Sequence, residues 1–387
     1  MAEMRWVNKL LFSSAITQGA VYVIRPMMIY RALELDASPS VIGFIAAIYA
    51  LFPVLLALTF GRLVGRVGEG RFVIFGTFFI GVSAVSLIVA DSLIVVAIGA
   101  ALSGLAHLAC MVGGQTMVAL KSPTDKYDEY FGKYTFSASL GQMIGPILAT
   151  LVAGSTGVIP RSTSAAFALA LALSALAMVP VISWREDAPT VIAELGDKGT
   201  FRAAGSLLKK PGMFAAVFTS LAISSTADIL VVFLPLYGSE NEFSAFSIGV
   251  IISIRAATSM TSRYFLGRLS AHFSTKQLLV SSNLISVLAC AAMAFAPNPL
   301  TLGIIVAIAG FSLGVGQPLT MSAVTQLSLP QERALAVSTR LTGNRLGQFI
   351  VPAGAGLLAA GSGTSAVFIA LSILLASTFL APSKIRP

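Results

Sequence analysis

The sequence predicts an all-α integral membrane protein of twelve transmembrane helices, arranged as two pseudo-symmetric six-helix bundles. Three observations favour this fold class: a shortage of charge, apolar runs as long as a membrane is thick, and an internal repeat. Only 11% of the 387 residues are charged and 56% are hydrophobic, with a mean hydropathy of +0.88. Soluble domains carry about 25% charged residues, so this chain has too little charge to cover a soluble globule of its size.

The apolar runs define the predicted helices. Runs such as Leu93 to Val118 and Leu278 to Pro297 can each cross roughly 30 Å of hydrocarbon as a helix. The first run continues past Arg25 without a small-residue cleavage pattern, which favours a spanning helix over a signal peptide. The runs and the turn signals between them predict helices near residues 10–30, 40–60, 72–90, 93–118, 134–154, 164–183, 212–236, 246–266, 277–296, 300–323, 336–358 and 364–381.

The distribution of Lys and Arg predicts the topology. An even number of helices puts both termini on one side, and the loops on the other side hold only Arg31 and Arg161. Because Lys and Arg accumulate in cytoplasmic loops, we expect both termini to be cytoplasmic and the chain to lie in the inner membrane. The net charge of +9 then reflects topology and not a nucleic-acid-binding surface. The cations assigned to the cytoplasmic side are Arg5, Lys9, Arg62, Arg66, Arg71, Lys121, Lys126, Lys133, Arg185, Lys198, Arg202, Lys209, Lys210, Arg263, Arg268, Lys276, Arg333, Arg340, Lys384 and Arg386.

The chain divides into two halves around its longest polar stretch. Residues 184–211 are predicted to be a cytoplasmic linker between an N-terminal bundle, residues 1–183, and a C-terminal bundle, residues 212–387. Short sequence matches recur at one offset of 206 residues, which predicts a duplicated six-helix unit: Gly43 and Gly249, Gly61 and Gly267, Gly141 and Gly347, and Pro146 and Pro352. Transporters are commonly built from such repeats, with the substrate held between the halves near the bilayer midplane.

A glycine-rich basic segment, Gly61 to Arg71, follows the second predicted helix, and Gly267-Arg268-Leu269 is its partial copy six helices later. Glycines permit a tight turn, and Arg62 and Arg66 suit a helix C-terminus beside anionic headgroups. A positively charged loop with no further role is the alternative. The pair of segments resembles the loop signature of the major facilitator superfamily, although both copies lack that signature's acidic residue. The resemblance implies the twelve-helix fold and a gating role without the family's charge-based latch.

In the fifth predicted helix, Gly141, Gly145 and Pro146 form a Gly-x-x-x-Gly-Pro element that resembles the antiporter motif of the same superfamily. Small residues allow close helix packing and Pro146 removes a backbone donor, so a bend is predicted. Close packing without a transport role is the alternative. The resemblance implies export. A further signature of the superfamily, an Arg in the fourth helix associated with proton coupling, is replaced by Ala100.

Four charged residues stand inside predicted spans: Asp228, Arg25, Arg255 and Arg345. A charge at the centre of a bilayer costs roughly 2.5 kcal/mol or more, so each must face protein or a water-filled cavity. We expect Asp228 to take up and release the coupling proton, and the three arginines to hold an anionic or zwitterionic substrate. An ion pair between Asp228 and Arg255 that only locks two helices together is an equal alternative.

Further polar residues are predicted to line the same cavity. Gln18, Tyr22 and Arg25 share one face of the first helix because their spacing is i, i+4 and i+7. His107 is expected to be a neutral, hydrogen-bonded packing residue, with a second proton-carrying group as the alternative. The other substrate-contact candidates are Tyr49, which stands 206 residues before Arg255, Asn344 and Gln348 near Arg345, and Gln317 before Pro318.

No enzymatic chemistry is predicted. The chain lacks the phosphate-binding loop of ATPases, and its two His and two Cys have no metal-site or catalytic spacing, so we expect no cofactor and no metal. We predict a monomeric secondary transporter that exports a small organic molecule, either a drug-like compound or a metabolite, in exchange for protons by alternating access. The alternatives are a proton-coupled uptake symporter of an organic anion and, in another class, a transport-inactive membrane receptor or scaffold.

Overall fold

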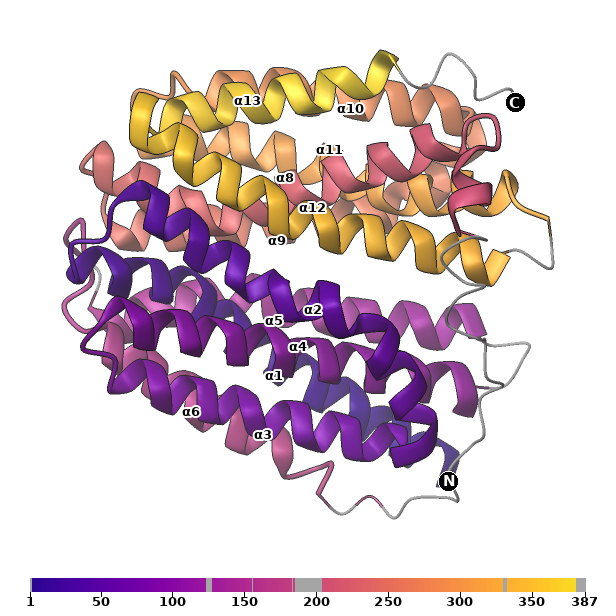
Figure 1. Ribbon diagram of the computed structural model, residues 1–387, viewed down its shortest axis with the longest axis horizontal. Coiled ribbons are helices and arrows are strands. Elements are labelled where there is room, and N and C mark those ends of the chain that lie inside the picture. The colour runs from indigo at the N-terminus through magenta and orange to yellow at the C-terminus, as the bar shows by residue number, and fades with distance from the viewer. Residues whose placement is uncertain are drawn as a thin grey trace.

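Twelve α-helices of fourteen residues or more form most of the described chain and run side by side (Figure 1). The computed structural model describes residues 2–122, 127–154, 156–182, 184, 204–329 and 333–380. The helices are α1 (Ala2–Glu34), α2 (Pro39–Val67), α3 (Glu69–Ile88), α4 (Leu93–Lys121), α5 (Tyr127–Ala153), α6 (Thr163–Met178), α8 (Met213–Glu240), α9 (Ala245–His272), α10 (Thr275–Met293), α11 (Pro299–Gln326), α12 (Arg333–Ser362) and α13 (Thr364–Ser377), followed by the 3-10 helix η3 (Thr378–Leu380).

Most of these helices are long and apolar enough to cross a bilayer. By length and composition, candidate spans lie in α2, α3, α4, α5, α8, α9, α10 and α11, while α6 and α13 are shorter apolar helices. The two remaining helices, α1 and α12, contribute the buried polar residues Gln18, Arg25 and Arg340. The predicted fold class, an all-α integral membrane protein with twelve helices, is confirmed.

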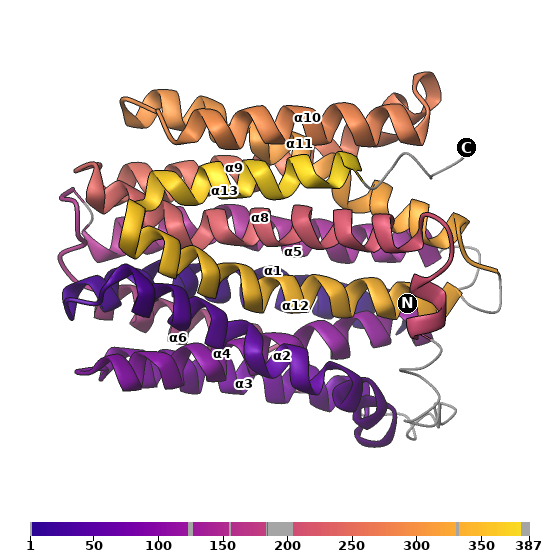
Figure 2. The same cartoon turned by 45° about the horizontal axis from the view of Figure 1, so that its top comes forward.

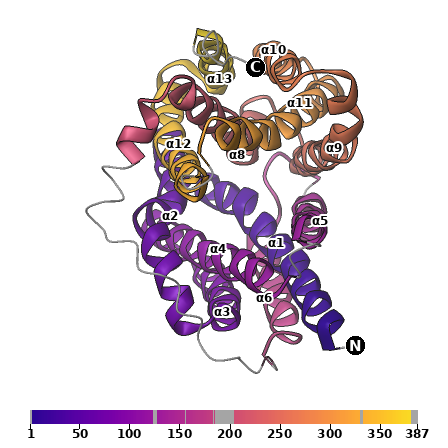
Figure 3. The same cartoon turned by 90° about the vertical axis from the view of Figure 1, so that its right-hand side faces the viewer.

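The helices form two groups of six. Figure 1 shows α1 to α6 in its lower half and α8 to α13 in its upper half, and the view toward the chain ends in Figure 3 shows the same separation. The groups meet mainly along two helix pairs, because α12 packs along α2 and α9 packs along α5. Figure 2 shows α12 next to α2. The residue limits of the two bundles and of the linker stay predictions, because most of residues 184–211 lie outside the described ranges.

Helix packing repeats at the 206-residue offset. Within each half, glycines make close helix approaches at equivalent positions: Gly141 against Ala15 and Gly347 against Leu221, and Gly104 against Tyr49 and Gly310 against Arg255. A Cβ atom added at any of these glycines would lie less than 3 Å from the neighbouring helix. Small residues let membrane helices approach this closely. The internal repeat is therefore present in the packing as well as in the sequence.

The two halves touch most closely at one end of the bundle. We call the end at which α1 begins and η3 ends the termini end, and the opposite end the far end. At the far end a Cβ on Gly43 of α2 would lie 2.6 Å from Gly356 of α12, and one on Gly249 of α9 would lie 2.5 Å from Thr150 of α5. Nearby, the backbone N–H of Ala245 donates to the carbonyl of Gly157 across 2.8 Å. Backbone and small side chains thus close the far end.

The same helices are less tightly joined toward the termini end. A Cβ added at Gly132, near the start of α5, or at Gly267, near the end of α9, would meet no atom within 4 Å. Among the glycines whose surroundings the structure describes, those that contact the other half therefore lie toward the far end.

The predicted turn over Gly61 to Arg71 is wrong in its extent. Helix α2 continues through Val67, Gly68 alone makes the turn, and α3 begins at Glu69. Gly68 has a φ of 101°, a conformation that residues with a Cβ rarely adopt. The partial copy at Gly267 is also helical, because α9 continues to His272.

The basic residues of these segments belong to helix ends. Arg66 and Arg268 are exposed near the ends of α2 and α9, and the Arg268 guanidinium lies 5.8 Å from the centre of the Phe265 ring. Side-chain detail at Gly61 and Arg62 lies outside the described part of the structure. The gating role of these segments stays a prediction.

Candidate functional site

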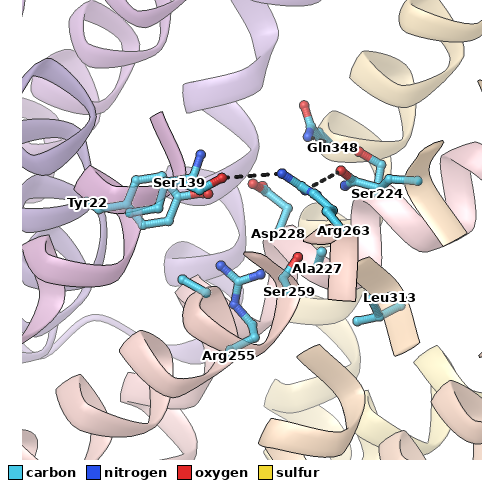
Figure 4. A pocket seen from close by; sticks show the side chains of 13 residues that line it. Tyr22, Ser139, Ser224, Ala227, Asp228, Arg255, Ser259, Arg263, Leu313 and Gln348 are labelled. Atoms are coloured by element: carbon cyan, nitrogen blue, oxygen red, sulfur yellow. Dashed lines mark hydrogen bonds between the residues drawn. The ribbon is translucent and has the colours of Figure 1, made fainter. Parts of the chain in front are cut away.

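A polar cavity of about 130 Å³ lies between the two halves. Helices α1 and α5 contribute to it from the first half, and α8, α9, α11 and α12 from the second. Only three of its lining residues, Ala227, Ala256 and Leu313, are apolar. Figure 4 shows Tyr22 and Ser139 on one side, facing Asp228, Arg255 and Arg263 on the other. The lining residues are Tyr22, Ser139, Gln142, Ser224, Ala227, Asp228, Arg255, Ala256, Ser259, Arg263, Leu313, Gln317 and Gln348.

An ion pair joins the halves at this cavity. Arg25 of α1 and Asp228 of α8 approach to 2.7 Å between Nη1 and Oδ1, with side chains only 4% and 14% exposed. An ion pair this far from water has little solvent screening, so removal of either partner would leave an uncompensated charge. The sequence-based alternative that pairs Asp228 with Arg255 is wrong, because Asp228 forms its ion pair with Arg25.

Arg25 is also held by aromatic rings. Its guanidinium carbon lies 4.7 Å from the centre of the Tyr49 ring and 5.8 Å from that of Tyr22. A cation over an aromatic face is attracted by the ring quadrupole, and most strongly where water is excluded. These rings fix the position of Arg25 for its contact with Asp228.

A chain of hydrogen bonds continues from Tyr49 into the first half. The Tyr49 hydroxyl lies 2.6 Å from Nδ1 of His107, and the other ring nitrogen, Nε2, lies 2.8 Å from the Gln18 amide. Gln18 also accepts a hydrogen bond of 3.4 Å from Gln142, which lines the cavity. His107 therefore uses both ring nitrogens in helix-to-helix contacts, as expected for a packing histidine. Its role as a second proton group stays a prediction.

The second half repeats part of this chain at the same offset. Gln348 donates to Ser224 across 3.4 Å, and these two residues stand 206 positions after Gln142 and Gln18. In addition, Arg345 donates to Gln348 across 3.0 Å. The two halves thus present equivalent amide contacts to the cavity, but the second half adds a cation.

Helix α9 brings two more cations to the cavity. Arg255 is buried, and no hydrogen bond or ion pair joins it to another described residue. Arg263 donates to Ser139 across 3.3 Å and to Gln317 across 3.0 Å, both of which are neutral acceptors. Figure 4 shows Arg255 and Arg263 directed toward the same space as Asp228.

With this geometry established, comparison with known proteins identifies the family. The sequence profile of the Major Facilitator Superfamily matches residues 10–270 and 228–386, which together span nearly the whole chain. The chain belongs to the major facilitator superfamily.

Curated relatives in this superfamily are drug-resistance proteins. The Multi-drug resistance efflux pump PmrA homolog of Lactococcus lactis is 28% identical over 225 residues, which covers 56% of this chain and 53% of the relative. Multidrug resistance protein MdtG of Escherichia coli O17:K52:H18 is 24% identical over 332 residues, covering 84% of this chain and 80% of MdtG. The MdtG of Yersinia enterocolitica is 25% identical, with 66% of its length covered. The chain therefore spans about half of the first relative and about two thirds of the last.

Solved structures of superfamily transporters share the fold. The nucleoside transporter NupG, as its D323A mutant, superposes with a TM-score of 0.82 at 14% identity and covers 98% of this chain and 100% of its own. A POT family transporter in complex with a thioalcohol-conjugated peptide gives a TM-score of 0.81 at 15% identity, covering 99% and 97%. At these identities the likeness concerns the fold alone. It agrees with the resemblance drawn from the sequence, and like its relatives in the superfamily this chain is not an enzyme.

The superfamily's glycine motif in α5 is a packing element in this chain. Gly141 and Gly145 lie against α1, where a Cβ on Gly145 would stand 2.7 Å from the Gly19 carbonyl. Pro146 stands inside α5 and its carbonyl accepts a hydrogen bond from Thr150. Close packing is thus present, and the export role of the motif stays a prediction.

The other candidates divide between the cavity and its surroundings. Tyr22, Asp228, Arg255, Gln317 and Gln348 line the cavity. Four candidates do not line the cavity but are connected to it through Asp228 and Tyr22: Arg25, Gln18, Tyr49 and His107. Arg345 is connected to it through its hydrogen bond to Gln348. Asn344 accepts a hydrogen bond from Ser220 at 2.9 Å and does not line the cavity.

Two arginines counted among the cytoplasmic-side cations contact the interior of the protein instead. Arg263 lines the cavity, and Arg340 of α12 is buried and donates to the Gln317 carbonyl and the Thr320 hydroxyl of α11. Both fall inside predicted helices, 246–266 and 336–358, but near the ends expected to be cytoplasmic, where a cation is ordinary and does not indicate a cavity. The spacing of Arg263 eight residues after Arg255, with Ser259 halfway, was the available signal, since helical residues four apart share a face.

Proposed function

We propose that this chain is a secondary active transporter that exports a small organic solute in exchange for protons. The superfamily fold and the drug-resistance relatives support transport of an organic solute. The single observation that carries the proposal is the Arg25–Asp228 ion pair, because it joins the two halves beside the cavity that Asp228 lines. Asp228 thereby couples the protonation state of the cavity to the contact between the halves.

The mechanism follows from the charge of one carboxylate. When Asp228 is ionised it binds Arg25 and holds α8 against α1 at the cavity. Protonation removes the negative charge, so the attraction to Arg25 is lost and the halves are free to rearrange. In the described conformation glycine contacts close the far end, so solute enters from the termini end. The topology proposed from the cation distribution places that end in the cytoplasm.

In this scheme one cycle exchanges a proton for a solute molecule. Solute binds in the cavity and weakens the contact of ionised Asp228 with Arg25, so the far-end contacts open and solute leaves on that side. Asp228 then takes up a proton from the more acidic far side, and the halves return and release the proton into the cytoplasm. Asp228 gains one proton and loses one proton in each cycle, so coupling requires only this carboxylate and Arg25.

Proton flux in proteoliposomes tests the proposal. Purified protein would be reconstituted with an internal pH dye, and a panel of organic solutes with cationic, neutral and anionic members would be added in turn. We expect wild type to show solute-dependent proton movement and Asp228→Asn to show none. Asp91→Asn is the matched control, because Asp91 lies exposed in the loop between α3 and α4.

The direction of proton movement and its dependence on Asp228 decide between the possible mechanisms. Proton movement opposite to the solute supports export by antiport, whereas movement in the same direction would replace antiport with uptake symport. Solute-driven proton flux in Asp228→Asn equal to that of wild type would reject the role of Asp228. Solute flux in wild type that never moves protons would reject the coupling.

A further inference from the structure

The second half of the cavity carries positive charge that no acidic side chain in the described part of the chain balances. Asp228 lines the cavity, but Arg25 already occupies it at 2.7 Å. Arg255 has no partner among the described residues, and Arg263 contacts only the neutral Ser139 and Gln317. The cavity therefore has a surplus of two guanidinium groups over carboxylates.

We propose that the cavity selects a solute with an oxyanion group, a carboxylate, sulfonate or phosphate, which binds Arg255 and Arg263. This inference rests on the proposed transport function in one respect: it takes the bound oxyanion to be the transported solute. It goes beyond that function because drug-resistance relatives do not specify the charge of the solute.

Helix geometry places the two cations on one stripe of α9. Arg255 and Arg263 are eight residues apart, so their Cα atoms are separated by about 12 Å along the helix axis. Ser259 stands one turn from each and also lines the cavity. Successive positions four residues apart are rotated by only about 40°, so the three side chains face the same space. Their stripe offers two cationic donors and a hydroxyl to one ligand.

Burial explains why this stripe needs a counter-charge. Arg255 is only 6% exposed, and an unpaired cation inside a membrane protein is costly unless water or an anion solvates it. A guanidinium presents a planar fork of donors that matches the two oxygens of a carboxylate or phosphate. A bound oxyanion therefore recovers interaction energy that the described side chains do not supply to Arg255.

Position along α9 assigns different tasks to the two arginines. Arg263 is exposed and lies nearer the termini end, so it meets the entering anion first, while the buried Arg255 binds it deeper. A cavity of about 130 Å³ admits a group of roughly one aromatic ring, since an engineered cavity of similar size binds benzene. The fit is to a small aromatic or aliphatic oxyanion.

Equilibrium binding tests this inference without any transport. Benzoate and benzamide have similar shape and differ in charge, so calorimetric titration of each into detergent-purified protein isolates the charge effect. We expect benzoate to bind and to weaken with rising salt, and benzamide to bind at least roughly tenfold more weakly, as loss of a charge-assisted contact predicts. Equal affinity for the two compounds would overturn the inference.

Variants on α9 locate the binding. We expect Arg255→Gln to weaken benzoate binding by roughly tenfold or more, Arg255→Lys to restore part of it, and Arg263→Gln to have a smaller effect because that residue is exposed. Arg268→Gln is the control, because Arg268 lies on the same helix outside the cavity. Thermal unfolding of each variant shows whether it is folded. Folded Arg255→Gln that binds benzoate like wild type would overturn the inference.

Lipid headgroups also present oxyanions, so a second set of titrations is needed to distinguish a free anion from a lipid headgroup as the ligand. Titrations would be repeated in nanodiscs of phosphatidylcholine alone and with phosphatidylglycerol. Unchanged benzoate affinity supports a free anion as the ligand, while competition by phosphatidylglycerol that disappears in Arg255→Gln assigns the site to an anionic lipid and overturns the assignment to cargo. Benzoate binding without any proton-coupled flux would reject the proposed function and leave the oxyanion site standing.

Discussion

Arg25 and Asp228 stand in different halves of the chain, and their side chains meet at 2.7 Å beside the cavity that separates those halves. The rings of Tyr22 and Tyr49 lie beside the arginine at this contact. One charge–charge contact therefore links the helix that begins the first half, α1, to the helix that begins the second half, α8. Its energy contributes to stability and, in the proposed transport cycle, to the choice between conformations.

The first prediction concerns the energy of this ion pair. Removing one partner of a buried pair typically costs about 3–5 kcal/mol, because the other charge is left without compensation. We expect Arg25→Gln and Asp228→Asn each to lower thermal stability clearly, and the double variant to recover much of the loss. Unfolding of the four proteins in one detergent gives the coupling energy as a double-mutant cycle. Additive losses in the double variant would show that the contact contributes little.

The second prediction separates the two contacts of Tyr49. Tyr49→Phe keeps the ring beneath Arg25 and removes the hydroxyl that contacts His107, so we expect a loss of about 1 kcal/mol. Tyr49→Leu removes the ring as well and should lose about 1 kcal/mol more, the size of a partly desolvated cation–π contact. Chemical unfolding of the two variants measures both steps. Equal stability of the two variants would assign the whole effect to the hydroxyl.

The third prediction concerns the packing of α5 on α1. A Cβ on Gly141 would overlap the Ala15 carbonyl, whereas one on Gly132 of the same helix would meet no atom within 4 Å. We expect Gly141→Ala to destabilise the protein by about 1–3 kcal/mol, the range typical of overpacking, and Gly132→Ala to be close to neutral. The yield and melting temperature of the purified variants provide the measurement. Wild-type behaviour of Gly141→Ala would contradict the close approach.

The fourth prediction concerns closure of the far end. A Cβ on Gly356 would lie 2.7 Å from the Cα of Gly43, while Gly354 of the same helix has no atom within 4 Å of an added Cβ. Gly356→Ala should therefore hold α12 away from α2 and favour a cavity open at the far end. Gly354→Ala should not.

Sided labelling of a cysteine at Ser259, which lines the cavity, reports this opening. With Cys110 and Cys290 replaced, a membrane-impermeant thiol reagent added on the far side should label Ser259→Cys faster in the Gly356→Ala background than in the Gly354→Ala background. Identical rates in the two backgrounds would show that the glycine contact does not control access.

The fold was readable from the sequence because each helix carries its own signal. Apolar runs of membrane length, Gly and Pro between them, and the 206-residue repeat each report on one segment or one pair of segments, with no knowledge of neighbours in space. The error over Gly61 to Arg71 has a local cause. Glycine and arginine in a row are typical of a turn, but here they continue α2, and Gly68 alone leaves helical geometry.

The site was readable only in part, because its contacts join helices far apart in sequence. The rarity of Asp228 and Arg255 within apolar runs marked them as buried charges, and that signal is local. The choice of Arg25 over Arg255 as the partner of Asp228 depends on α1 lying beside α8, which helical periodicity does not report. Arg263, inside the predicted helix 246–266, was counted with the cytoplasmic-side cations because its charge is the same whether it faces headgroups or a cavity.

The far-end contact between Gly43 and Gly356 brings two helix backbones together without a side chain between them. This contact has no interdigitated side chains and no charged group that must be hydrated when the helices separate. Separation of the two backbones therefore loses only weak dispersion contacts. In the proposed mechanism the barrier to reorientation is then set by the ion pair in the middle of the molecule, so a change in the charge of Asp228 releases the contact between α2 and α12 at the far end.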